Sequence, residues 1–347
     1  MWTYIARRLL SGFLLLFAIT AVTFVISRLS PLDPACLAIV CTSETTSAQL
    51  KAARHRLGVD RPVYVQFAKF AWRLIRRQSF GASWQRGDID AVLKAALPET
   101  ASIVVGGVFV LLLLALPLAI VSAVRAHTAI DRGILLVSIV GIAFHPFVIG
   151  LLLRRFFAED LHLAPAYGYC PLHGHAASIY PPSYNGLPPP PWLKVKPCVG
   201  PLGWAHHLLL PWITFALFFL PIYVRLIRAR ILDALQQPHV VAARARGASE
   251  LRIVRKQVLR LALLPLAAMV TLEIGGALMA AIYIEQIYNI SGLGKLVLSL
   301  LTGEIVAFDL PLIAAIFFTI AAIIVVLNLI ADLIQGALDP RVRGAHR

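Results

Sequence analysis

The stretch Ile103–Val124, IVVGGVFVLLLLALPLAIVSAV, decides the class of the fold, because it contains no charged residue. A helix of about 20 apolar residues crosses the hydrocarbon core of a bilayer, and it satisfies its own backbone hydrogen bonds there. The whole chain is 59% hydrophobic and 14% charged, against about 25% charged in soluble domains. Five further runs contain one charged residue or none: Leu9–Leu29, Ile134–Leu153, Leu208–Val224, Leu266–Ile284 and Pro311–Ala331. We therefore expect an all-α integral membrane protein with six transmembrane helices.

The charges beside these runs orient the helices, because Lys and Arg are enriched in the short cytoplasmic loops of membrane proteins. If the N-terminus lies inside, the inside segments carry Arg7, nine Lys or Arg within 225–260, and the basic tail 341–347. We therefore expect a multi-pass protein with both termini in the cytoplasm. The net charge of +15 then reflects membrane topology, and a nucleic-acid partner, which would need a soluble basic domain, is not expected.

The runs divide the chain into regions. The first run is expected to remain in the protein, because it is too long for the apolar part of a cleaved signal peptide. We expect an N-terminal tail and first helix (1–30), an extracytoplasmic loop region with short helices (31–98), a core domain with five helices (99–340) and a cytoplasmic tail (341–347). The core contains a cytoplasmic loop at 225–265 and a Pro- and Cys-rich extracytoplasmic loop at 158–204.

Two short helices are expected in the first loop. Thr46 can cap a helix that ends before Gly58. After Pro62, apolar residues share one helical face and basic residues surround them, which is typical of an amphipathic helix at a membrane interface. A helix packed on the other membrane helices explains the pattern equally well, so both interpretations stay open. The apolar residues are Tyr64, Phe67, Ala71 and Leu74, and the basic ones are Lys69, Arg73, Arg76 and Arg77.

All four cysteines fall on the expected outside, where disulfide bonds persist. The even number suggests the pairs Cys170–Cys198 and Cys36–Cys41, although spacing alone does not fix the pairing. Cys170 also lies near His173 and His175, but this spacing matches no standard closed zinc site. We therefore favour loop histidines beside a disulfide bond and expect no metal in this chain.

Ionisable groups inside the expected membrane region are candidates for the transport path. Glu273 lies within the fifth run, and intramembrane carboxylates face a protein interior or water. A neighbouring helix or a second subunit could equally satisfy it. Glu285 and His145 are further pore candidates, but Pro146 follows His145 and removes a helix hydrogen bond, so a kink is the favoured interpretation there.

The cytoplasmic stretch 239-HVVAARARGASE-250 is basic and rich in small residues. It predicts a helix that Gly247 ends, followed by a second helix that Ser249 caps. Small side chains allow another protein surface to approach closely, and the arginines would meet acidic groove edges. A basic loop that binds anionic lipid would explain the arginines but not the run of small residues.

Energy for transport has no source in this sequence. The chain contains no G-x-x-x-x-G-K-[ST], no G-x-S-x-G and no H-E-x-x-H motif, and no catalytic constellation. An enzyme acting at the outside loops would rest on the Cys/His cluster alone, so we do not expect catalysis. A partner or an ion gradient must therefore supply the energy.

Several stretches in order resemble one family. Ala242-Ala243-x-x-x-Gly247 looks like the EAA loop of ABC importer permeases. Nearly the whole chain resembles the dipeptide, oligopeptide and nickel branch, in the subunit type with a large first extracytoplasmic loop. Val241 stands where the general pattern has Glu, and the second outside loop is longer than usual. The other matching stretches are Tyr4–Leu10, Arg28–Pro34, Leu57–Pro62, Phe80–Ser83, Leu97–Thr100, Val258–Pro265, Glu285–Tyr288, Gly292–Gly294 and Leu338–Arg341.

The resemblance implies a type I ABC importer permease of the bacterial inner (plasma) membrane that imports di- or oligopeptides or related solutes. It implies a second homologous permease, two cytoplasmic ATP-binding subunits that hold ATP and magnesium, and an extracytoplasmic solute-binding protein. No cofactor is expected in this chain. The alternative, an ion-coupled secondary transporter using Glu273, would need internal repeats, and we see none. The implied ATPase-coupling residues are Val241, Ala242, Ala243, Arg244, Arg246, Gly247, Ala248 and Ser249.

Overall fold

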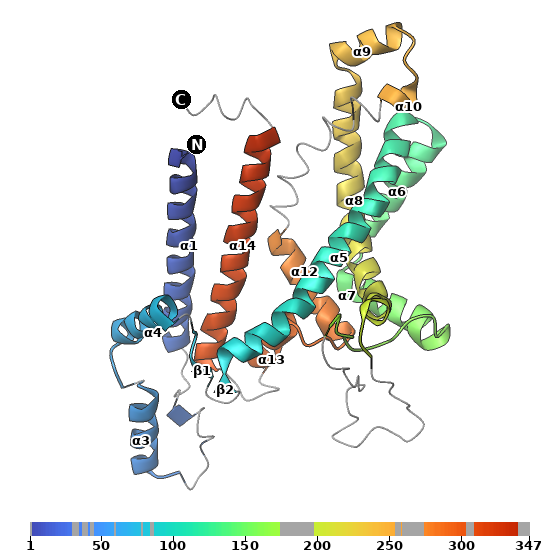
Figure 1. Ribbon diagram of the computed structural model, residues 1–347. Coiled ribbons are helices and arrows are strands. Elements are labelled where there is room, and N and C mark those ends of the chain that lie inside the picture. The colour runs from blue at the N-terminus through green and yellow to red at the C-terminus, as the bar shows by residue number, and fades with distance from the viewer. Residues whose placement is uncertain are drawn as a thin grey trace. The chain divides into compact units, whose positions relative to one another are not determined.

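The structure, a computed structural model, divides into two compact units (Figure 1). Unit 1 comprises Met1–Pro98 and Lys295–Ile330, and unit 2 comprises Glu99–Gly294 and Ala331–Arg347. The residues described are 2–29, 35–36, 41, 45–58, 60–77, 79–83, 87–173, 198–253, 258, 274–302 and 309–338.

Long apolar helices dominate the described residues. Three of them are long and apolar enough to cross a membrane: α5 (Ile89–Val124), α8 (Pro201–Leu235) and the Pro311–Ile330 part of α14 (Leu310–Leu338). Helix α1 (Trp2–Leu29) contains the apolar stretch Leu10–Val22. Four of the six predicted runs therefore lie within one helix each.

The third predicted run, Ile134–Leu153, is not one straight helix. It is divided between α6 (Ala129–Ile142) and α7 (Pro146–Leu153), which continues as the π-helix η1 (Arg154–Asp160), and the two halves are bent by 102°. The break lies where the sequence predicts a kink. Pro146 occupies the first turn of α7, where a missing N–H costs nothing, and the His145 ring accepts a hydrogen bond from the Phe147 N–H at 3.3 Å.

The fifth predicted run is described only in part. Its residues from Ile274 onward lie in α12 (Ile274–Ile287), while the preceding residues, Glu273 included, lie outside the described residues. A short apolar helix, α13 (Leu293–Thr302), follows after a turn.

The part of unit 1 between α1 and α5 contains α3 (Ser47–Leu57), α4 (Val63–Arg77) and two short antiparallel strands, β1 (Ala82–Ser83) and β2 (Gly87–Asp88). The predicted start of α3 is confirmed by a capping box between Thr46 and Gln49. Its predicted end is confirmed by Gly58, which has a φ of 68°. The strands are a small departure from the all-α expectation. The Ser83 hydroxyl donates a hydrogen bond to Asp309, which precedes α14.

Unit 2 is built around α8, which packs on α6, α7 and α12. Glycines bring α5 close to the aromatic face of α8. A Cβ atom at Gly106 would lie 2.1 Å from the Trp212 ring, and one at Gly107 would lie 2.5 Å from Phe215. The Trp212 indole N–H donates a hydrogen bond to the Ser102 carbonyl at 2.8 Å. These contacts make α8 a firmly packed stem for the segment that follows it.

Candidate functional site

The segment after α8 folds as the sequence predicts. Helix α9 (Pro238–Ala245) ends at Gly247, whose φ is 82°, and α10 (Glu250–Ile253) begins after Ser249 (Figure 1). The Gly247 N–H donates to the Arg244 carbonyl at 3.0 Å, and the Ala248 N–H donates to the Ala243 carbonyl at 3.2 Å. This pair of bonds is a Schellman motif, which fixes the direction in which the chain leaves α9.

One side of this segment packs inward and the other is exposed. Val240 and Ala243 are buried and join the core of unit 2, and Ala248 is half-buried against it. Val241 is 52% exposed. Ala243 is therefore a packing residue, and the surface open to another molecule is narrower than the sequence pattern suggests. It comprises Val241, Ala242, Arg244, Ala245, Arg246, Gly247 and Ser249.

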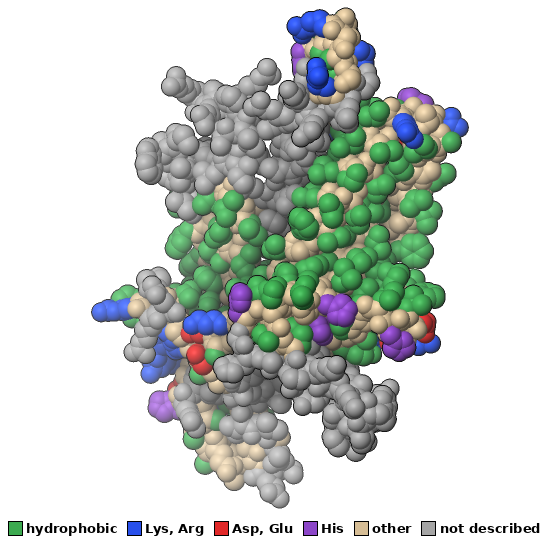
Figure 2. Space-filling view, turned by 45° about the vertical axis from the view of Figure 1, so that its right-hand side comes forward, with side chains coloured by type: hydrophobic (Ala, Val, Ile, Leu, Met, Phe, Trp, Pro, Cys, Tyr) green, Lys and Arg blue, Asp and Glu red, His purple; other side chains and the backbone are tan. Residues whose placement is uncertain are grey.

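The exposed side of α9 and its turn is cationic (Figure 2). The Arg246 side chain returns toward its own helix, where its Nε donates to the Ala242 carbonyl at 3.2 Å. Arg252 on α10 is also exposed. The surface thus combines small side chains with guanidinium groups at its edges, which suits a groove edged by carboxylates.

A buried ion pair ties α8 to the turn between α5 and α6. Asp131, on the first turn of α6, is 2% exposed, and its carboxylate is held in a bidentate pair by Arg228 of α8. Arg228 Nε donates to Oδ1 at 2.8 Å, and its Nη2 donates to Oδ2 at 2.7 Å. Two carboxylate oxygens bound by one planar guanidinium fix both distance and orientation.

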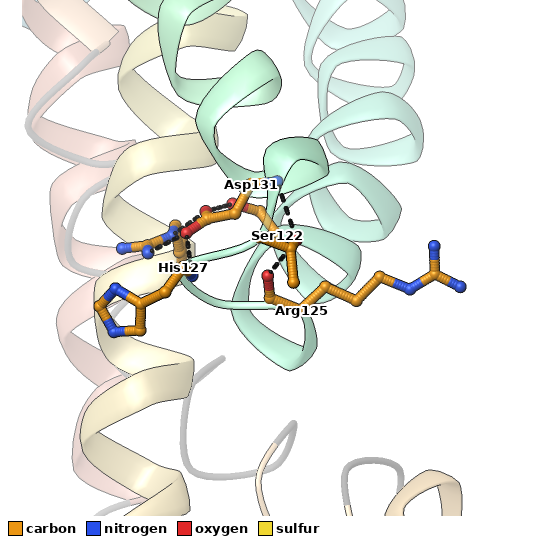
Figure 3. A network of polar contacts seen from close by, with 6 residues as sticks. Ser122, Arg125, His127 and Asp131 are labelled. Carbon is orange, nitrogen blue, oxygen red and sulfur yellow. Dashed lines mark hydrogen bonds and ion pairs between the residues drawn. The ribbon is translucent and has the colours of Figure 1, made fainter.

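The remaining acceptor positions of Asp131 are filled from the turn itself (Figure 3). The Ser122 hydroxyl donates to Oδ1 at 2.5 Å, and the His127 backbone N–H donates to Oδ2 at 2.9 Å. Thr128 caps α6, while the Arg125 side chain points away from the cluster. These four hydrogen bonds to one buried carboxylate hold the α5–α6 turn rigidly against α8, the helix that carries α9.

The Asp131–Arg228 pair with its further donors, called the clamp below, was not predicted from the sequence. A signal was present: Asp131 is an acid close to a helix-capping Thr128 between two predicted spans, and Arg228 lies just past the end of another span. What the sequence lacks is the pairing of α6 with α8, which follows from how the helices pack.

Glu285, a predicted pore residue, is completely buried. The Thr100 hydroxyl donates to Glu285 Oε1 at 2.6 Å, and the Leu293 N–H donates to the same hydroxyl at 2.8 Å. A Cβ atom at Gly292 would lie 2.3 Å from Glu285 Oε1 and 2.5 Å from Thr100 Oγ1. The structure thus encloses the carboxylate among α5, α12 and the glycine turn, and a role in the pore stays a prediction.

The other two pore candidates have different positions. His145 is exposed at the break between α6 and α7, and its ring lies edge-on to Tyr283 of α12 at 4.5 Å between centroids. Glu273 lies outside the described residues. Neither position tests a role in the transport path.

The four cysteines form two disulfide bonds, Cys36–Cys41 in unit 1 and Cys170–Cys198 in unit 2. Gly203 packs on the second, because a Cβ atom there would lie 2.6 and 2.7 Å from its sulfurs. His207 Nδ1 is 3.8 Å from Cys198 Sγ. The one Cys/His group near enough to share a metal among the described residues is Cys170, Cys198 and His207, and the bond between the sulfurs leaves no thiolate there. His175 lies outside the described residues.

Comparisons with known proteins agree along nearly the whole chain. The family model described as binding-protein-dependent transport system inner membrane component matches residues 115–344. The model of its N-terminal part matches residues 1–103.

Two curated relatives match over 99% of this chain and 99% of their own length. They are the oligopeptide transport system permease protein AppB of Bacillus subtilis, at 29% identity, and the di/tripeptide transport system permease protein DppB of Pseudomonas aeruginosa, at 27%. A chain of the MetNI methionine ABC transporter in an inward-facing conformation has a TM-score of 0.50 at 15% identity. That match covers 72% of this chain and 96% of that one.

These findings fit the type I ABC importer permease fold and do not favour the secondary-transporter alternative. The chain belongs to the family of binding-protein-dependent transport system inner membrane components: it is a multi-pass permease subunit of an ABC importer, which works with ATPase and solute-binding partners.

Proposed function

We propose that this permease imports short peptides and that the α9 segment is its contact with a cytoplasmic ATPase. The likeness of the full chain to oligopeptide and di/tripeptide permeases supports the substrate class. In this proposal the chain pairs with a second homologous permease and two ATP-binding subunits that hold ATP and magnesium. A solute-binding protein delivers the peptide outside, and both termini lie in the cytoplasm.

The observation that carries the coupling proposal is the exposed side of α9 and its turn. Val241, Ala242 and Ala245 project no more than a few atoms each, so a partner's backbone can approach closely. Arg244 and Arg246 flank them and suit carboxylates on the groove edges. Val241 replaces the acid of the general family pattern, which leaves this surface with positive charge at its edges.

The Asp131–Arg228 clamp supports the same function, because a coupling helix must pass on motion without bending its stem. Moving a two-state pore from 1:99 to 99:1 takes about 5.5 kcal/mol of differential interaction. Breaking a buried ion pair costs about 3–5 kcal/mol, so the clamp resists distortion on a comparable scale.

The coupling contact is tested by comparing two side chains at Gly247 that have nearly the same shape and differ in charge. Asp and Asn have nearly the same size, and both adopt the left-handed conformation that Gly247 has. In the purified importer reconstituted in vesicles, Gly247→Asp is expected to abolish ATP-driven uptake and uncouple ATP hydrolysis from substrate. Gly247→Asn is expected to retain most of both activities. Wild-type transport by Gly247→Asp would refute the contact.

The substrate class is tested separately, with the same vesicles and the isolated solute-binding protein. Uptake of radiolabelled dipeptide is measured in the presence of unlabelled dipeptides, longer peptides, free amino acids and nickel. Competition by peptides alone supports the proposal. Competition by nickel, or by no peptide at any concentration, would overturn the substrate class and leave the coupling proposal intact.

A further inference from the structure

Helix α4 has one side packed against other elements of unit 1 and one side exposed. On the packed side, the Phe67 ring lies edge-on to Phe17 of α1 at 5.4 Å between centroids. Phe70 is buried, and its ring is 6.2 Å from that of Phe80. The packing interpretation is therefore confirmed for one side of α4, and the interfacial interpretation stays a prediction for the exposed side.

The open face carries large aromatic side chains beside cations. Tyr64 is 74% exposed and Trp72 is 61% exposed. Lys69 and Arg76 are exposed as well, and the Arg76 guanidinium lies 5.1 Å from the centre of the Trp72 ring. Trp and Tyr with Lys or Arg are the residues that hold a helix at the boundary between acyl chains and headgroups.

The charge of α4 has one sign. The sequence VYVQFAKFAWRLIRR contains Lys69, three arginines and no acidic residue. Such a helix complements an anionic surface, and each cation near an anionic bilayer contributes to binding.

The neighbour of α4 determines which anionic surface it meets. Helix α1 is the first membrane helix, and it leaves Phe13, Leu14 and other apolar side chains exposed, as a lipid-facing helix does. Helix α4 lies beside α1 (Figure 1), and Lys and Arg side chains stand on its outer surface (Figure 2). A helix fixed to a lipid-facing helix is exposed to the lipids of the same bilayer.

We propose that α4 is a lipid anchor: it lies at the headgroup level of the bilayer, and Lys69 and Arg76 bind the phosphates of anionic phospholipids. Trp72 and Tyr64 then lie at the boundary with the acyl chains. The anchor fixes α1 and the first loop relative to the membrane surface. The proposal does not depend on α9 or on the substrate.

The position of Trp72 is tested in the assembled importer in nanodiscs, by fluorescence with brominated phospholipid. The Trp72 signal is the difference between the wild-type protein and Trp72→Phe. Quenching of this signal by bromine near the top of the acyl chain, and not by aqueous iodide, is expected. Quenching by iodide alone would overturn the proposal. A signal that responds only to added solute-binding protein would assign the face to that protein and overturn it equally.

The role of the cations is tested by lipid retention. In detergent at low salt, the amount of phosphatidylglycerol that co-purifies is expected to fall about fivefold per cation in Lys69→Gln/Arg76→Gln. Lys51→Gln/Arg61→Gln removes the same charge from exposed residues of α3 and of the turn before α4, and it is expected to retain the lipid. Equal retention by both variants would contradict the headgroup contact, even if the protein folds normally.

Discussion

Helices α9 and α4 are both short and basic, but different side chains stand beside their cations. On α9 the neighbours are Ala242, Ala245 and Gly247, while on α4 they are Tyr64 and Trp72. Small side chains give a protein surface close access to a backbone. Large aromatics instead cover a fluid interface that adapts to their shape. Charge of the same sign therefore does not determine the partner, and the side chains beside the cations distinguish a protein surface from a lipid surface.

Their supports differ as well. The stem of α9 is held by the buried Asp131–Arg228 pair, whereas α4 is held by aromatic packing through Phe67 and Phe70. A lever that must move with its stem needs fixed geometry, which a bidentate ion pair supplies. An anchor needs attachment, for which apolar contacts suffice.

The largest expected effect comes from breaking the support of α9. Asp131→Asn leaves the half-buried Arg228 without its counter-charge and is expected to destabilise the protein by about 3 kcal/mol, the lower end of the range for breaking a buried ion pair. SDS unfolding followed by circular dichroism measures this. Asp160→Asn, in an exposed pair with Arg155, is the control and is expected to change stability by at most about 1 kcal/mol. Similar unfolding of both variants would show that the clamp does not stiffen the stem.

A tryptophan placed on α9 should lower uptake, whereas a tryptophan placed on α4 should not. Ala242→Trp is expected to reduce uptake about fivefold or more, because overpacking a close contact costs about 1–3 kcal/mol. Ala68→Trp adds the same side chain to the exposed face of α4, where lipid can rearrange, and is expected to leave uptake unchanged. Both are measured in vesicles at equal protein content. Equal loss in both variants would remove the distinction between a protein contact and a lipid contact.

The smallest effect concerns the glycines that end α9 and α3. Gly247 and Gly58 both have positive φ, and a Cβ atom added at either would meet no other atom within 4 Å. Ala at either site is expected to cost about 1–2 kcal/mol of left-handed strain. In the uptake assay, Gly247→Ala is expected to lower uptake slightly, because the strain lies in the coupling turn. Gly58→Ala is expected to leave uptake unchanged, because Gly58 lies outside that turn. Reduced uptake in Gly58→Ala alone would reverse this expectation.

The sequence predicts features that depend on neighbouring residues. Thr46 and Gly58 delimit α3, Pro146 breaks the third span, and Gly247 ends α9, because each acts on its own backbone. The resemblance to ABC permeases rests on such local stretches and identified the family.

Features that depend on packing between distant segments were not predictable. The pairing of Asp131 with Arg228 joins two helices that the sequence separates, and Ala243 is buried because Val240 and Ala243 face the core together. The enclosure of Glu285 by Thr100 and Gly292 has the same origin. A pattern of small or charged residues shows what a side chain can do, and only the fold shows which direction it faces.

The central claim, that the exposed side of α9 contacts an ATPase, is tested most directly by site-specific cross-linking. Val241→Cys, labelled with a short photo-reactive group in the assembled importer, is expected to cross-link to an ATP-binding subunit identified by mass spectrometry. Ala68→Cys on α4, labelled in the same way, is expected to cross-link to lipid. A Val241 variant that transports normally but cross-links only to lipid, or to no ATP-binding subunit, would contradict the account.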